Sequence, residues 1–82
     1  MILNIDRGHI HVQLGEKMAA IPGEMLFPEN KRLGFVVYLD QIDYWEPKTA
    51  KQPISEADIK TIVDGIQAEF KERGHMLEFE SA

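Results

Sequence analysis

Apolar and polar positions alternate in the first half of the chain with the period of a β-strand. From His9 to Leu14, every second residue is a large aliphatic one, while the residues between them are polar. This period of two is typical of a strand with one buried face. Residues 34–39 are β-branched or aromatic and apolar on both faces, which predicts a strand in the middle of the sheet.

Several shorter stretches complete the predicted sheet. Residues 2–6, 17–21, 24–27 and 42–46 are expected to be extended, and residues 29–32 form a polar loop between two of these strands. Pro22-Gly23 is a dipeptide common in turns, so we predict a turn at this point. The polar pair Asp40-Gln41 is expected to be a brief break after the central strand.

The period changes to that of a helix after a linker at residues 47–53. Ser55 is a favourable N-cap, Asp58 stands at the capping-box position three residues later, and Gly74 is a typical C-terminal stop. These signals predict a helix of about 18 residues. Its apolar face consists of Ile59, Ile62, Val63, Ile66 and Phe70. Gly65 within it suggests close packing on the sheet.

A last strand follows the helix at Met76–Glu80. Met76, Glu78 and Glu80 share one face, and the charged residues indicate a position near the sheet edge. We therefore predict a single α+β domain over residues 1–82: an antiparallel sheet of about five to six short strands, one face covered by a long C-terminal amphipathic helix, and a short final strand.

Composition and charge narrow the classes of function. The 82 residues carry 14 acidic and 9 basic side chains, for a net charge of −5. This charge opposes nucleic-acid binding and favours a basic partner. The chain has no cysteine, which excludes disulfides, thiolate metal sites and cysteine nucleophiles. The N-terminus does not resemble a signal peptide, and no apolar run approaches the length of a membrane span, so we expect a cytoplasmic protein without a membrane partner.

Candidate chemistry is sparse. His9 and His11 share a strand face and could ligate a metal, but a zinc site needs further ligands, so two solvent-facing histidines are the favoured interpretation. Capping explains Ser55, and no glycine-rich phosphate loop occurs. We predict no catalytic residue, no cofactor and no metal. A small metal-dependent enzyme or metal carrier that uses the two histidines is the alternative.

A short segment after the central strand gathers acids around the one tryptophan. Aromatic residues beside charges are common in protein interfaces. The predicted partner-binding residues are Asp40, Asp43, Tyr44, Trp45 and Glu46. The alternative is that Trp45 packs under the helix as a core residue and the acids are merely solvated.

Several of these features together resemble a known family. They are Gly23-Glu24, Val36-Val37-Tyr38-Leu39, Ile42, Trp45-Glu46-Pro47, Pro53-Ile54-Ser55, the helix with Ile59, Ile62 and Ile66, Gly74, and Glu78-Phe79-Glu80. This pattern resembles immunity protein 74.

The resemblance implies a bacterial immunity protein of a polymorphic toxin system, which binds a cognate toxin domain and neutralises it without catalytic residues. An acidic surface would suit a basic toxin such as a nuclease. We expect a monomer or a weak homodimer. The alternative function is a self-associating structural or adaptor domain.

Overall fold

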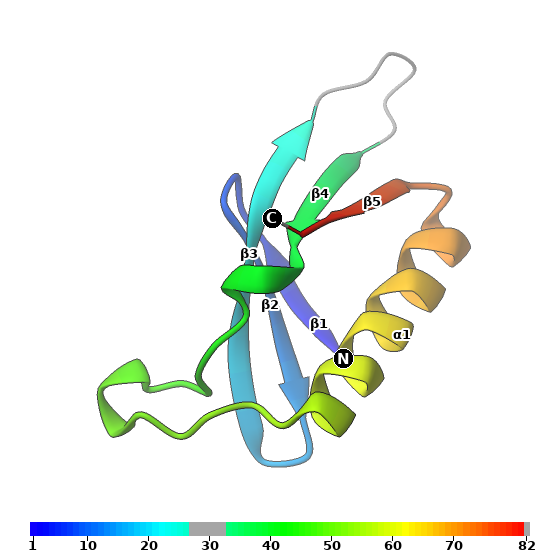
Figure 1. Ribbon diagram of the computed structural model, residues 1–82. Helices are drawn as coiled ribbons and strands as arrows, with labels where there is room; N and C mark the ends of the chain where they lie inside the picture. Colours follow the sequence, from blue (N-terminus) through cyan, green and yellow to red (C-terminus); the bar gives the residue numbers. More distant parts are fainter. Residues whose placement is uncertain (27–32, 82) are drawn as a thin grey trace.

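The computed structural model describes residues 1–26 and 33–81, in which five strands form one sheet and a long helix lies against it (Figure 1). In chain order the elements are β1 (Ile2–Ile5), β2 (His9–Leu14), β3 (Lys17–Leu26), β4 (Gly34–Tyr38), the 3₁₀ turns η1 (Leu39–Gln41) and η2 (Lys48–Ala50), α1 (Glu56–Arg73) and β5 (Met76–Glu80). The strands lie in the order β1-β2-β3-β4-β5. The predicted α+β class is confirmed.

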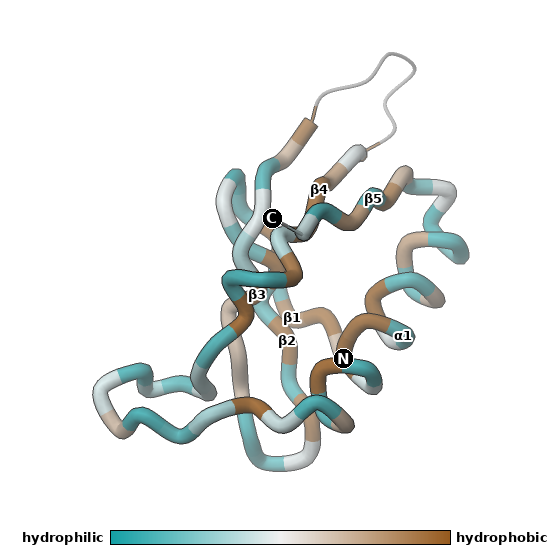
Figure 2. Tube along the Cα trace, in the orientation of Figure 1, coloured by the Kyte–Doolittle hydropathy of each residue, from teal (hydrophilic) through white to brown (hydrophobic). Residues whose placement is uncertain are grey.

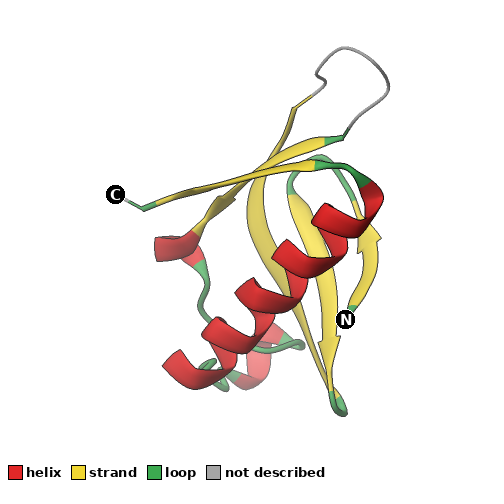
Figure 3. Ribbon diagram, turned by 90° about the vertical axis from the view of Figure 1, so that its right-hand side faces the viewer, coloured by secondary structure: helices red, strands yellow, loops and turns green. Residues whose placement is uncertain are grey.

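The sheet is mixed, so the prediction of an antiparallel sheet is wrong for its last pair. The first three strand pairs are antiparallel, but β4 and β5 are parallel. The linker and α1 together form the connection between these two strands, and α1 crosses the sheet before β5 begins (Figure 3). A crossover of this kind returns the chain to the end of the sheet from which β4 started, and β5 therefore runs in the same direction.

The predicted turn at Pro22-Gly23 is also wrong, because β3 runs straight through it. The amides of Gly23 and Met25 donate to carbonyls of the segment before β2. Successive residues of a strand direct their backbone amides to opposite edges. The nitrogen of Pro22, which has no hydrogen to donate, therefore faces the edge toward β4, and pairing with β4 starts only at Gly23. The predicted strand at 24–27 is thus the end of β3, while Phe27 and the predicted polar loop at 29–32 lie outside the described residues.

Residues 42–46 do not form the predicted strand. Tyr44 makes a single bridge with Pro53, and the predicted break at Asp40-Gln41 is part of η1. The amide of Glu46 donates to the Met18 carbonyl at 2.7 Å. This segment therefore lies along the first half of β3, whose edge β4 leaves unpaired.

The helix follows its sequence signals closely. The Ser55 hydroxyl accepts a hydrogen bond from the Asp58 amide at 3.1 Å, and Gly74 adopts the left-handed conformation with φ of 69°. Hydrophobic positions recur along α1 and along the strands (Figure 2). The buried core consists of Ile10, Val12, Ala19, Ile21, Phe35, Val37, Trp45, Ile54, Ile62, Ile66 and Phe70. Gly65, expected to allow close packing on the sheet, faces the side chain of Met1, the residue before β1, where an added Cβ would lie 3.0 Å away.

Candidate partner-binding surface

The two faces of the sheet differ in what covers them. On the face toward α1, aliphatic side chains of β2, β3 and β4 are buried. On the other face, which we call the open face, none of the side chains that strand alternation and register assign to it is buried. These side chains are His9, His11, Gln13, Met18, Ala20, Pro22, Glu24, Leu26, Val36, Tyr38, Met76, Glu78 and Glu80. The open face is therefore available to a partner.

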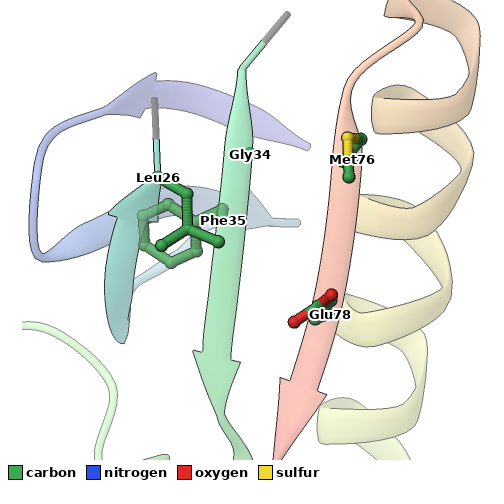
Figure 4. A pocket seen from close by; sticks show the side chains of 5 residues that line it. All are labelled: Leu26, Gly34, Phe35, Met76 and Glu78. Atoms are coloured by element: carbon green, nitrogen blue, oxygen red, sulfur yellow. The ribbon is translucent and has the colours of Figure 1, made fainter. Parts of the chain in front are cut away.

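Exposed apolar side chains gather where β3, β4 and β5 run side by side. The register aligns Leu26, Gly34 and Met76 in one row across the three strands. Leu26 is 40% exposed and Met76 is 50% exposed. Because Gly34 has no side chain between them, a hollow forms, with Phe35 and Glu78 completing its lining (Figure 4).

The hollow is small. Its volume of about 30 Å³ is close to that of one water molecule and far below the several hundred Å³ of an ordinary ligand pocket. Its apolar rim is suited to accept the tip of one side chain from another protein rather than to enclose a substrate.

Acidic side chains flank the apolar row. Glu24, Val36 and Glu78 align in the next row, and Glu80 pairs with Tyr38 one step further along. We call Glu24, Leu26, Val36, Tyr38, Met76, Glu78 and Glu80 the acidic–apolar patch. Its seven members include three carboxylates and no basic residue.

The carboxylates of the patch affect the ionisation of its tyrosine, Tyr38. The Tyr38 hydroxyl donates to Glu24 Oε2 at 3.1 Å. This hydrogen bond to the carboxylate, with the negative charge of Glu80 nearby, raises the pKa of Tyr38 above its usual value. The three carboxylates of the patch carry negative charge, which favours positively charged groups.

The two histidines lie at the other end of the open face, in contact with Asp6. Their rings are 5.8 Å apart, and Asp6 Oδ2 is 2.7 Å from Nε2 of His11. Asp6 Oδ1 also accepts the amides of Gly8 and His9. The bond with His11, aided by the two amides, lowers the pKa of Asp6 to about 2.

These contacts identify Asp6 as the residue that shapes the β1–β2 turn. In the part of the chain that the structure describes, no group of three or more His, Cys, Asp or Glu side chains is arranged to hold a metal ion.

The five predicted partner-binding residues are divided between surface and core. Trp45 is 2% exposed and belongs to the core cluster, with Lys17 Nζ 5.4 Å from its ring centroid. Its neighbours Asp40 and Glu46 are exposed, and η1, which carries Asp40, contacts both β3 and β5. Tyr44 is partly buried.

The Asp43 carboxylate is held within its own segment. It accepts the Tyr44 amide at 2.6 Å and lies 3.3 Å from Lys48 Nζ. Both contacts lower the pKa of Asp43, the amide having the larger effect. Its charge is therefore partly satisfied before any partner arrives.

Sequence reasoning did not find the acidic–apolar patch. The shared face of Met76, Glu78 and Glu80 was evident from alternation alone. That Glu24 and Leu26 lie beside them, across β4, follows from the strand order and from the parallel placement of β5, which the local pattern does not contain.

Residues 2–80 match the family described as immunity protein 74, a span that includes every strand and the helix. The chain belongs to the immunity protein 74 family. No curated protein and no solved structure gives a match.

Membership of the immunity protein 74 family confirms the resemblance stated from the sequence. Among the described residues, no helix is both long enough and apolar enough to cross a membrane.

Proposed function

We propose that this chain neutralises a cognate toxin domain by forming a stoichiometric complex, with the acidic–apolar patch as the main contact surface. The observation that supports this proposal is the exposure of Leu26 and Met76 on an uncovered sheet face, flanked by Glu24, Glu78 and Glu80. Apolar centres with polar rims are typical of protein interfaces.

The dimensions of the molecule are compatible with this role. A standard interface buries about 800 Å² on each partner. The accessible surface of the chain is 5465 Å², so such an interface would occupy roughly one seventh of it. Inhibition by binding requires such a contact area and no cofactor.

The charge of the patch supports a basic partner. Nucleases bind phosphate backbones with Lys and Arg, so their active surfaces are positively charged. Three carboxylates around an apolar centre would complement such a surface and increase the rate of encounter. A nuclease-type toxin whose basic surface this patch covers is therefore the partner that we propose.

The segment predicted from the sequence is a second candidate contact. Asp40 and Glu46 remain exposed, whereas Trp45 would act only by holding the segment in place from the core. The two surfaces can be tested against each other with charge reversals of equal size.

The experiment co-expresses the chain with the products of the neighbouring genes, among which we expect a toxin domain. The variant Glu24→Lys/Glu78→Lys alters the patch, and Asp40→Lys/Glu46→Lys alters the linker segment. Circular dichroism confirms that each variant folds. We expect a 1:1 complex and protection of the cells, with affinity reduced by about a hundredfold or more in the first variant and changed little in the second.

The reverse ranking would assign the contact to the linker segment. Absence of a complex with the wild-type chain would contradict toxin neutralisation. If light scattering then showed a stable homodimer that buries the patch, the self-associating structural or adaptor domain would be the better description.

A further inference from the structure

Among the described strands, the sheet has three stretches of outer edge, and two of them are protected. At β1, the pairing with β2 is irregular between Ile2 and Asn4, and the outward amide of Ile2 donates to Glu69 Oε2 of α1 at 3.0 Å. At the first half of β3, the linker lies against the edge through the bond from Glu46 to Met18. Bulges and covering segments of this kind prevent pairing with other chains.

The outer edge of β5 lacks these protections. Its five residues pair with β4 in unbroken register, from Gly34 opposite Met76 to Tyr38 opposite Glu80. The strand contains no proline and no lysine, and its charged residues, Glu78 and Glu80, oppose pairing with an acidic strand but not with a basic one. Helix α1 lies close to the start of β5, where the chain passes from one to the other, and the two diverge toward the C-terminal end of the strand (Figure 3).

The direction of the backbone groups on β5 follows from one hydrogen bond. The Met76 amide donates to the Leu33 carbonyl, on the side of β4, at 2.8 Å. Because successive residues of a strand direct their amides to opposite edges, the amides of Glu78 and Glu80 also point toward β4. The amides and carbonyls of Leu77 and Phe79 therefore point outward, where the described part of the chain places no further strand.

We propose that the β5 edge receives an extended segment of the toxin as a sixth strand. This inference rests on the proposed function and specifies how the complex forms. Main-chain hydrogen bonds to Leu77 and Phe79 would supply the pairing, as in other cases of strand addition. The edge adjoins the acidic–apolar patch, so one partner can engage both.

The side chains along the edge define the chemistry of the added strand. Glu78 and Glu80 stand on the open face and are exposed, whereas Leu77 and Phe79 stand on the face toward α1 and are partly buried. Since neighbours in a sheet share a face, the added segment should carry basic residues on the open side. Apolar residues on its other side would complete the cover over Leu77 and Phe79.

A second copy of this chain is a poor occupant of the same edge. In a fully overlapped antiparallel pair of β5 strands, Glu78 of each copy would lie directly opposite its counterpart, with both Glu80 side chains on the same face. Like charges in directly opposed positions destabilise a sheet. The net charge of −5 adds long-range repulsion. A basic segment of another protein meets neither obstacle.

Amide hydrogen exchange by NMR tests this geometry in the free chain and in its complex with the toxin domain that the co-expression experiment identifies. In the free chain, Leu77 and Phe79 should exchange faster than Glu78 and Glu80, which are bonded to β4. In the complex, exchange at Leu77 and Phe79 should slow by at least about tenfold. The amide of Glu16, at the β2–β3 turn, serves as a control distant from β5 along the chain.

Each outcome has a distinct meaning. If a tight complex forms but the amides of Leu77 and Phe79 exchange as fast as in the free chain, strand addition is wrong and toxin neutralisation is still supported. If no complex forms, both proposals fail. If both amides are already protected in the free chain and light scattering shows a dimer, the edge pairs with a second copy and the inference is wrong.

Discussion

At the scale of single residues, Gly23 determines how closely β4 can approach β3. A Cβ at this position would lie 2.0 Å from the Val36 carbonyl oxygen and 2.4 Å from a ring carbon of Phe35. No other residue fits without displacing backbone. The glycine of the Pro-Gly dipeptide is therefore needed for a close backbone approach rather than for a chain reversal.

The variant Gly23→Ala should lose about 3 kcal/mol or more of stability, because the added methyl group meets a carbonyl that cannot move without breaking the β3–β4 pairing. The matched control is Gly8→Ala, where the nearest atom to the added Cβ is Asp6 Oδ1 at 4.0 Å. Its stability should stay within about 0.5 kcal/mol of wild type. Urea denaturation measures both, and equal losses would contradict this account.

Asp6 links stability to pH at the residue scale. Its pKa is about 2 in the folded chain, against an ordinary value of 3.8. A lowered folded pKa means that the carboxylate stabilises the fold above pH 3.8 and that this contribution is lost as the pH falls through about 2.

The variant Asp6→Asn should therefore be less stable than wild type at pH 5, and the difference should shrink as the pH falls toward 2. Thermal unfolding of both proteins across this range measures it. Asp64→Asn is a suitable control, since Asp64 pairs with Lys60 on the exposed side of α1. A difference between wild type and Asp6→Asn that does not vary with pH would refute the assigned role of Asp6.

At the scale of elements, the linker between η1 and α1 is held in place by its tryptophan. Trp45 is 2% exposed, its amide donates to the Gln52 carbonyl, and the next amide donates to β3. The linker thus closes one side of the core and leaves Asp40 and Glu46 on the surface. The sequence indicated both roles for Trp45, as interface or as core, and burial supports the second.

Replacing Trp45 with alanine should cost about 3–5 kcal/mol, as for other large buried aromatic residues, and Trp45→Phe should cost less. Urea denaturation followed by circular dichroism measures both. If Trp45→Ala were nearly as stable as wild type but bound the toxin domain poorly, Trp45 would be a contact residue rather than a core residue.

The other elements differ in how well local sequence predicted them. Helix α1 was predicted almost to the residue because its cap at Ser55, its stop at Gly74 and its apolar spacing are all local. Strand β2 was predicted for the same reason. The continuation of β3 through Pro22 was not predicted. It depends on which edge of β3 the proline nitrogen faces, and this is decided by the neighbouring strands.

At the scale of the whole molecule, the crossover through α1 brings together residues that are far apart in the chain. Placing β5 beside β4 aligns Glu78 with Glu24 across Val36. Together with the net charge of −5, this alignment gives the open face its negative potential, through which we expect a basic partner to be attracted.

Binding of the toxin domain should accordingly depend on ionic strength. Raising sodium chloride from about 50 mM to about 500 mM should slow association about tenfold or more, while dissociation changes little, because salt screens long-range attraction more than close contacts. Stopped-flow mixing measures both rates. The variant Glu24→Lys/Glu78→Lys should show a weaker salt dependence, and an association rate insensitive to salt would exclude steering by charge.

The sequence by itself determined the α+β class, the limits and apolar faces of α1 and of β2, and the family. These properties depend on spacing and capping within a few residues. The tertiary structure alone decided the parallel pairing of β5, the path of β3 through Pro22, the burial of Trp45 and the acidic–apolar patch. Each of these depends on which strands become neighbours, and long-range contacts formed across the crossover, not local spacing, select those neighbours.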